Sequence, residues 1–306
     1  MMAMSCCCIA QDRILWNDPG SVESINFDHA AGGMDQAPRP PFYFLAERSG
    51  GSSPKILVRD SASIQWRVKG GYETRTESFV TRLVAALGYF AEPVWFIGSG
   101  KMNGVASLKK AAGFIHPDGS FPEAAFELRD KSLRKLSQDW LWTTNPFLRT
   151  PELNGLKIVM MLVSNWDNKN ARERREGSNT GISERDAGGR IRLIYHVTDW
   201  GQAMGAWGAE PVAKGWDCSK FTAQTASFVQ GRGGQYVRFG YVGRHTDDFK
   251  NDITLDDVRW SMQYLGRLSD VQLQHGLKAS GATPAEITCF GAQLRERINQ
   301  LRRVIG

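Results

Sequence analysis

Five charged residues of this sequence have the types and the order that phosphoryl transfer from ATP requires. Lys69 and Glu77 lie close together in the first third of the chain, and Asp167, Lys169 and Asp199 follow in the second half. In this chemistry a lysine neutralises the α- and β-phosphates, and a helix carboxylate orients that lysine. One aspartate receives or steers the proton of the acceptor hydroxyl, and another holds Mg²⁺ against the phosphates. The order of the residues therefore predicts a phosphotransferase that uses ATP and Mg²⁺.

The residues before Lys69 predict short strands joined by a flexible turn. Aromatic and apolar runs at 42–45 and 55–59 are typical of strands. The residues between them are rich in glycine and serine and include Gly50 and Gly51. Because a turn of this kind lets backbone amides approach phosphate oxygens, Gly50 and Gly51 are candidate nucleotide-binding residues.

The residues around Lys69 and Glu77 predict a strand followed by a helix. Apolar and polar residues alternate over 64–68, so Lys69 should leave the face of the strand opposite to the apolar one. Apolar residues over 79–87 then recur at helical spacing. Glu77 could instead complete a capping box with Thr74, in which case Glu73 is the alternative partner of Lys69.

The second half of the chain places the two aspartates on loops. Residues 152–163 read as a buried helix that runs directly into the loop with Asp167 and Lys169. Residues 172–190 are polar and rich in glycine, which predicts a surface loop. A strand over 191–197 then delivers Asp199, and His196 in that strand is interpreted as structural.

Several stretches resemble an uncharacterised bacterial family of atypical kinase-like proteins, distantly similar to HipA-type and phosphoinositide kinases. The resemblance implies an α+β, two-lobed protein-kinase-like fold. It would have an extended segment at 1–40, a small β-rich lobe with one helix at 41–128, and a mainly helical lobe at 129–306. The matching stretches are P-K-I-L-V-R-D (54–60), the strand and helix at 66–90, W-L-W-T-T-N-P-F (140–147), the helix and loop at 152–169, and Y-H-V-T-D-W-G (195–201).

The resemblance also implies a role for each candidate residue. Lys69 would hold the α- and β-phosphates, and Glu77 would orient it. Asp167 would position or deprotonate the acceptor hydroxyl, and Lys169 would neutralise the γ-phosphate. Asp199 would bind the metal ion.

One position departs from the family pattern. The family has an asparagine five residues after the catalytic aspartate, where this sequence has Arg172. A guanidinium has no acceptor atom and cannot ligate Mg²⁺. Three alternatives stay open: Asn170 supplies the second metal oxygen, one metal ion held by Asp199 suffices, or the protein is a pseudokinase.

Two other classes of function remain beside the kinase hypothesis. One is a nucleotide-binding scaffold without catalysis, and the other is nucleotidyl or glutamyl transfer on the same fold. The acceptor, a protein or a small molecule, cannot be read from the sequence. The basic C-terminal residues 295–303 fit an amphipathic helix with its charges outward, so no nucleic-acid partner is expected.

Composition narrows the classes of protein to which this sequence can belong. The chain has 306 residues, of which 42% are hydrophobic and 23% charged, with a formal net charge of +6. This is long and apolar enough for two packed lobes. No apolar run is long enough to span a membrane. Five cysteines without a C-x-x-C pair, three of them adjacent, predict neither a zinc site nor a disulfide framework.

The N-terminus leaves the location of the protein open. As written, the sequence predicts a cytoplasmic protein, because it begins without a basic segment and a long apolar segment. A truncated or misassigned start would make it secreted, periplasmic or a lipoprotein.

Overall fold

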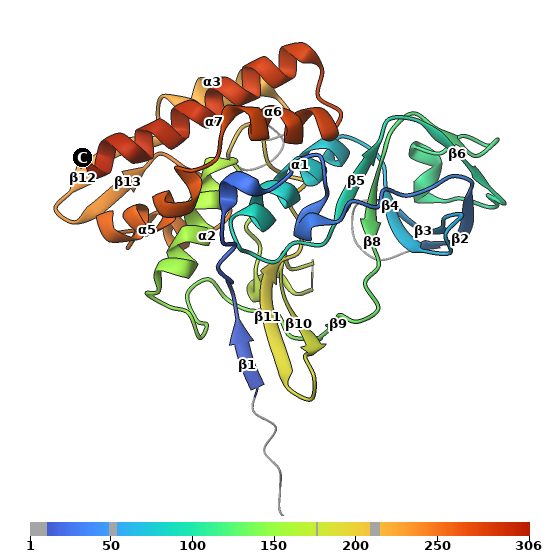
Figure 1. The fold of residues 1–306 in the computed structure, drawn as a ribbon, viewed down its shortest axis with the longest axis horizontal. Coiled ribbons are helices and arrows are strands. Elements are labelled where there is room, and N and C mark those ends of the chain that lie inside the picture. The colour runs from blue at the N-terminus through green and yellow to red at the C-terminus, as the bar shows by residue number, and fades with distance from the viewer. Residues whose placement is uncertain (1–10, 49–53, 176, 209–214) are drawn as a thin grey trace, which may run out of the picture.

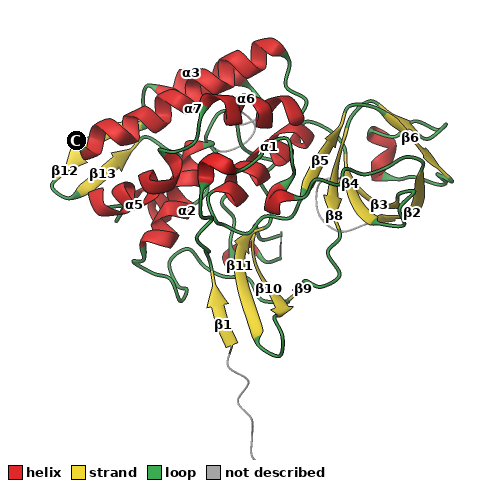
Figure 2. Ribbon diagram, viewed as in Figure 1, coloured by secondary structure: helices red, strands yellow, loops and turns green. Residues whose placement is uncertain are grey.

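The computed structural model describes residues 11–48, 54–175, 177–208 and 215–306. It is an α+β protein, as predicted. Strands gather in one part of the molecule and helices in another, and a separate hairpin projects below them (Figures 1 and 2). Gly50 and Gly51 lie outside the described residues.

The first part is a seven-stranded sheet with the order β5-β8-β4-β3-β2-β6-β7. Trp66 and Val68 are fully buried on one face, where they pack with Ile56, Val58 and Phe126 in a core of their own. The bounds of its strands are β2 Phe42–Arg48, β3 Lys55–Arg59, β4 Gln65–Lys69, β5 Val94–Ile97, β6 Gly100–Asn103, β7 Ser120–Phe121 and β8 Ala124–Leu128.

The predicted helix after β4 is α1, Glu73–Ala86. Its apolar side, including Phe79 and Leu83, is fully buried and belongs to the larger core of the helical part. The chain turns after α1 at Gly88, which has a φ of +88°. A Cβ there would lie 2.2 Å from the carbonyl oxygen of Asn17, so only glycine fits this turn.

Helices dominate the second part, and the longest, α7, crosses the top of the molecule in Figure 1. Two small sheets accompany them, with the orders β1-β11-β10-β9 and β12-β13. The helices are α2 Pro151–Leu162, α3 Cys218–Thr225, α4 Thr246–Lys250, α5 Leu255–Leu265, α6 Asp270–Ala279 and α7 Pro284–Ile305, with short 3₁₀ turns at Val22–Ser24, Ala31–Gly33, Lys110–Gly113 and Ala171–Glu173. The strands are β1 Gln11–Ile14, β9 Arg134–Lys135, β10 Thr180–Asp186, β11 Ile191–Val197, β12 Val229–Gly233 and β13 Tyr236–Phe239.

The predicted surface loop at 172–190 is wrong in its second half. Strand β10 occupies part of it and pairs antiparallel with β11 along its whole length. Its polar side chains are buried because they find partners: the Thr180 hydroxyl donates to the carbonyl of Trp140, and Ser183 bonds the His196 ring at 2.9 Å. The glycine-rich residues form the turn of this hairpin.

His196 is structural, as predicted. Its ring is buried, and burial lowers the pKa of His196 to about 4.

The N-terminal segment, which is predicted as extended, contributes residues to the larger core. β1 pairs in parallel with β11, and Val22 and Phe27 are buried in the larger core. The Gln272 side chain of α6 donates to the carbonyls of Val22 and Ile25, which fixes this segment on the helices.

The expectation that all charges of 295–303 point outward is wrong for Arg297. This residue is fully buried, since it lies one helical turn from Leu294 and Leu301 on the apolar face of α7. Its guanidinium donates to the carbonyls of Leu162 and Phe221 at 2.8 and 3.0 Å. Burial holds the pKa of Arg297 well below its ordinary value.

The expectation of no disulfide is also wrong. Cys218 at the start of α3 and Cys289 in α7 are bonded, with Cα atoms 6.3 Å apart. The two cysteines lie 71 residues apart in the chain, and only the packing of α3 against α7 brings them together.

None of the helices in the described ranges is long and apolar enough to cross a membrane.

The disulfide predicts a loss of stability on reduction. Cross-linking a loop of this length restricts the unfolded chain, so the variant with Cys218→Ser and Cys289→Ser should lose about 2–4 kcal/mol of unfolding free energy. Guanidinium unfolding with and without dithiothreitol measures it. Reductant should destabilise the wild type and leave the double variant unchanged. Equal unfolding of the oxidised and reduced wild type would contradict the prediction.

Candidate functional site

Lys69, the last residue of β4, forms a buried ion pair with Glu77 of α1. Its Nζ lies 2.5 Å from Oε1 of Glu77, and both residues are 3% exposed. The predicted salt bridge is therefore present. The capping-box interpretation of Glu77 is wrong, because α1 begins at Glu73 and the Thr74 hydroxyl donates to the carbonyl of Gly71 instead.

The alternative carboxylate, Glu73, faces the segment after Asp199. It accepts a hydrogen bond from Gln202 at 2.7 Å, and a Cβ on Gly201 would lie 2.8 Å from its side chain. The first turn of α1 thus packs directly on the glycine of the Asp199–Gly201 turn. Glu77 contacts Lys69, and Glu73 contacts the turn.

The charge of Asp199 acts on the Lys69–Glu77 pair. Burial disfavours the ammonium of Lys69, but nearby carboxylates, with Glu77 and Asp199 foremost, outweigh burial and raise its pKa. Burial also raises the pKa of Glu77, which Lys69 opposes and Asp199 reinforces. Asp199 itself accepts a hydrogen bond on Oδ1 from the amide of Gly201 at 3.0 Å. A carboxylate thus adds to the electrostatic stabilisation of a buried lysine, a combination that suits a metal–phosphate site.

Asp167 lies on the loop that follows α2. The turn begins at Ser164, which has a φ of +55°. Two cations flank the Asp167 carboxylate: Lys169 Nζ is 3.1 Å from Oδ2, and Arg244 Nε is 2.9 Å from Oδ1. The loop is further fixed by Asn168, whose Oδ1 accepts from the amide of His245.

The segments that carry Asp167 and Asp199 lie side by side. Asn165 donates from its side chain to the carbonyl of Asp199 at 3.3 Å. Asn179 bridges the same two segments, since its carbonyl accepts from the amide of Thr198 and its Nδ2 donates to the carbonyl and carboxylate of Asp167 at 2.6 and 3.0 Å. Two asparagines therefore join the loops into one site.

Asn170 and Arg172 are both engaged in local contacts. Oδ1 of Asn170 accepts from Nα and Nε of Arg172 at 3.0 and 3.1 Å, and Asn170 caps the 3₁₀ turn that begins at Ala171. The guanidinium of Arg172 pairs with Asp248 of α4. Arg172 is thus held by α4, and the oxygen of Asn170 is already occupied by its donors.

The sequence reasoning missed Asn179. It stands twelve positions after Asp167, directly before β10, in residues that were expected to form a loop. The signal that could have revealed it is the pairing of β10 with β11: a strand antiparallel to the one that leads to Asp199 must begin beside Asp199.

The residues present fit a metal ion that is held partly by phosphate. Within the described ranges no three His, Cys, Asp or Glu residues cluster as a metal site by themselves. Mg²⁺ usually takes one or two carboxylates and completes its shell with phosphate oxygens and water. Asp199 beside Lys69 suits that mode, since the lysine would bind the same phosphates.

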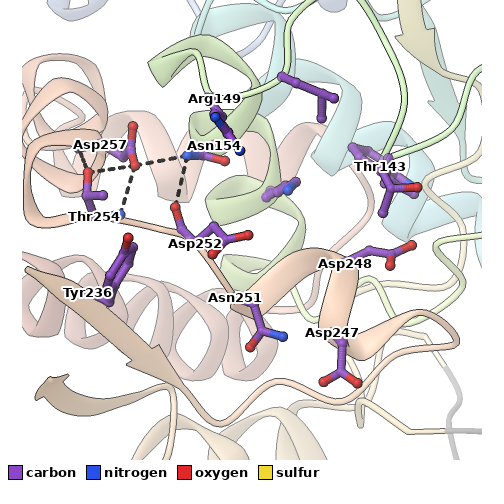
Figure 3. A pocket seen from close by; sticks show the side chains of 13 residues that line it. Thr143, Arg149, Asn154, Tyr236, Asp247, Asp248, Asn251, Asp252, Thr254 and Asp257 are labelled. Atoms are coloured by element: carbon purple, nitrogen blue, oxygen red, sulfur yellow. Dashed lines mark hydrogen bonds between the residues drawn. The ribbon is translucent and has the colours of Figure 1, made fainter.

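A cavity lies apart from these residues. It has a volume of about 720 Å³ and is lined by side chains of α2, α4 and α5, such as Asn154, Asp248 and Asp257 (Figure 3). Asn154 donates to Asp257 at 2.9 Å in its wall. Asp248, the partner of Arg172, connects it to the loop after Asp167. None of the predicted site residues lines this cavity.

Two solved structures are similar to this chain. One is the proinflammatory kinase CtkA of Helicobacter pylori, with a TM-score of 0.44 and 13% identity over 82% of this chain and 92% of that chain. The other is a Golgi casein kinase with Mn/ADP bound, with a TM-score of 0.40 and 10% identity over 88% of this chain and 73% of that chain. No family model and no curated protein matches the sequence. At these scores the likeness carries no argument, and the function rests on the site.

The buried pair predicts strong coupling between Lys69 and Glu77. Removing one partner leaves the other buried without a counter-charge, so Lys69→Met and Glu77→Gln should each lose about 3–5 kcal/mol of unfolding free energy. The double variant should lose much less than the sum, because neither charge is left behind. Denaturant unfolding of the four proteins measures this coupling. Additive losses would show that the two side chains do not interact.

Proposed function

We propose that this protein is a kinase-like phosphotransferase, which uses ATP and Mg²⁺ to phosphorylate a hydroxyl acceptor. The observation that supports the proposal is the buried Lys69–Glu77 pair, whose helix packs on the turn after Asp199, with Asp167 on the adjoining loop. The nucleotide would lie between a β-rich lobe at 41–128 and a helical lobe at 129–306, after an N-terminal segment at 1–40.

The buried pair would position the nucleotide. Lys69 would donate to the α- and β-phosphates, and Glu77 would keep its ammonium group charged and directed at them. Asp199 would hold Mg²⁺, which when bound neutralises the phosphate charge. Gly50 and Gly51 are proposed to approach the phosphates through their backbone amides.

Asp167 would act on the acceptor. Its carboxylate is held by Asn179, Lys169 and Arg244, so its direction is fixed before the acceptor arrives. It would accept the hydrogen bond of the acceptor hydroxyl and receive its proton as the phosphoryl group transfers. Lys169 would then turn from Asp167 to the γ-phosphate.

We propose Asn179 as the neutral metal ligand, in preference to Asn170. Both donors of an amide group are on nitrogen. Because Nδ2 of Asn179 faces Asp167, its Oδ1 is left as the acceptor for a metal ion between the two loops. Oδ1 of Asn170 already accepts two hydrogen bonds. In this account Arg172 does not block a metal site, so the pseudokinase alternative loses its main support.

The disulfide supports an oxidising location. Bonds such as Cys218–Cys289 form and persist outside the cytosol. We therefore favour the secreted or periplasmic alternative over the cytoplasmic one.

The two aspartates should separate binding from turnover. Asp199→Ala should abolish the Mg²⁺-dependent part of ATP binding, since it removes the metal carboxylate. Asp167→Ala should leave ATP binding within about twofold and remove turnover, because this carboxylate acts on the acceptor. The change in melting temperature on adding ATP, with and without Mg²⁺, measures the binding effect of Asp199→Ala. Transfer of labelled phosphate from γ-labelled ATP measures the turnover effect of Asp167→Ala.

Controls and products decide among the alternatives. Asp247→Ala, in the cavity wall, removes a carboxylate that makes no hydrogen bond or ion pair with the described residues of the proposed site and should bind ATP normally. Release of ADP indicates phosphoryl transfer, whereas release of AMP and pyrophosphate would indicate nucleotidyl transfer. Wild-type protein that shows no shift with ATP would overturn the proposal.

The two asparagines should differ in their effect on turnover. If Asn179 ligates the metal, Asn179→Ala should lower Mg²⁺-dependent turnover by about 10²–10³-fold, the usual loss for a transition-state charge ligand. Asn170→Ala should cost much less, and Arg172→Asn should raise turnover little. Steady-state rates across a Mg²⁺ titration measure all three. A large loss for Asn170→Ala with normal Asn179→Ala would assign the metal oxygen to Asn170.

A further inference from the structure

Lys55 is the first residue of β3 and lies directly across from Lys69. The register pairs Lys55 with Lys69 of β4 on one side and with Arg48 of β2 on the other. Side chains that are paired across neighbouring strands leave the same face of a sheet. Arg48, Lys55 and Lys69 therefore form a row of three cations across β2, β3 and β4, which we call the cation row.

The cation row runs from the buried pair toward solvent. Lys69 is buried, Lys55 is half-buried and Arg48 is exposed. Neighbouring strands lie about 4.8 Å apart, so three strands place the row over roughly 10 Å, on the order of the length of a triphosphate chain. The row thus extends the proposed phosphate site outward by two strands.

The ammonium group of Lys55 makes no hydrogen bond and no ion pair among the described residues, whereas that of Lys69 is paired with Glu77. The nearby Lys69 ammonium, and then burial, lower the pKa of Lys55, while Asp199, Glu77 and Glu127 act in the opposite direction. Two like charges opposite each other on a sheet are destabilising. An arrangement that costs stability in the free protein suits a ligand with several negative charges.

We propose that Lys55, with Arg48 beyond it, binds the phosphate chain of the nucleotide outside Lys69. This inference rests on the proposed function, and it identifies the phosphate chain as the part of the nucleotide that Lys55 and Arg48 recognise. The protein would distinguish nucleoside di- and triphosphates from monophosphates, because only the longer chains reach from Lys69 to Lys55.

The test compares nucleotides that differ only in phosphate number. Calorimetric titration with ATP, ADP, AMP and adenosine is carried out on the wild type, Lys55→Met and Arg59→Met. Arg59 is the matched control, since it is a cation on the same strand but pairs with Gln65, away from Lys69. Lys55→Met should weaken ATP and ADP by about tenfold, the typical loss of one charge-assisted contact, and leave adenosine unchanged. Arg59→Met should bind all four like the wild type.

A second readout separates binding from folding. Without nucleotide, Lys55→Met should melt at the same temperature as the wild type or higher, since it relieves the repulsion with Lys69. Equal ATP affinity in Lys55→Met and the wild type overturns the inference, and so does an equal loss for ATP and adenosine.

The failure of this inference can be told from the failure of the proposed function by Lys69→Met. If ATP binds the wild type and Lys69→Met weakens it while Lys55→Met does not, only the role of Lys55 is lost. If the wild type binds no nucleotide, both proposals are overturned.

Discussion

The buried ion pair of Lys69 and Glu77 constrains how β4, α1 and the turn after Asp199 are packed together. A lysine at 3% exposure costs free energy unless a counter-charge is held close to it. That requirement fixes α1 against β4, and α1 in turn contacts the turn after Asp199 through Glu73. The charge of Asp199 also acts on the pair, so the sheet, α1 and this turn meet where the nucleotide site is proposed.

The second constraint is the set of hydrogen bonds that Arg297 makes at the start of the loop that carries Asp167. Arg297 reaches from α7 to the carbonyl of Leu162 at the end of α2, so the last turn of that helix is satisfied by a side chain rather than by a following glycine. The same guanidinium donates to the Ser164 hydroxyl, at the residue where the loop begins. The described residues give Arg297 no carboxylate partner, and its charge is offset by carbonyls and aromatic rings, with the centroid of the Phe221 ring 3.7 Å from the guanidinium carbon.

Local patterns predicted much of this structure, and long-range contacts account for what they missed. Alternation over 64–68 placed Lys69 on the correct face of β4, and helical spacing predicted α1. Arg297, the Cys218–Cys289 bond and Asn179 depend on which helix or strand packs beside them, which no local pattern contains. β10 was missed because its side chains are polar and become buried only through partners on β11 and in the Trp140 segment.

The most direct test of the central claim is a crystal structure of the full chain with a non-hydrolysable ATP analogue and Mg²⁺. We expect phosphates within hydrogen-bond distance of Lys69, a metal ion on Asp199, and a terminal phosphate directed toward Asp167 and Lys169. A nucleotide bound elsewhere, such as in the cavity of Figure 3, would contradict it. So would a bound nucleotide whose phosphates leave the Lys69–Glu77 pair untouched.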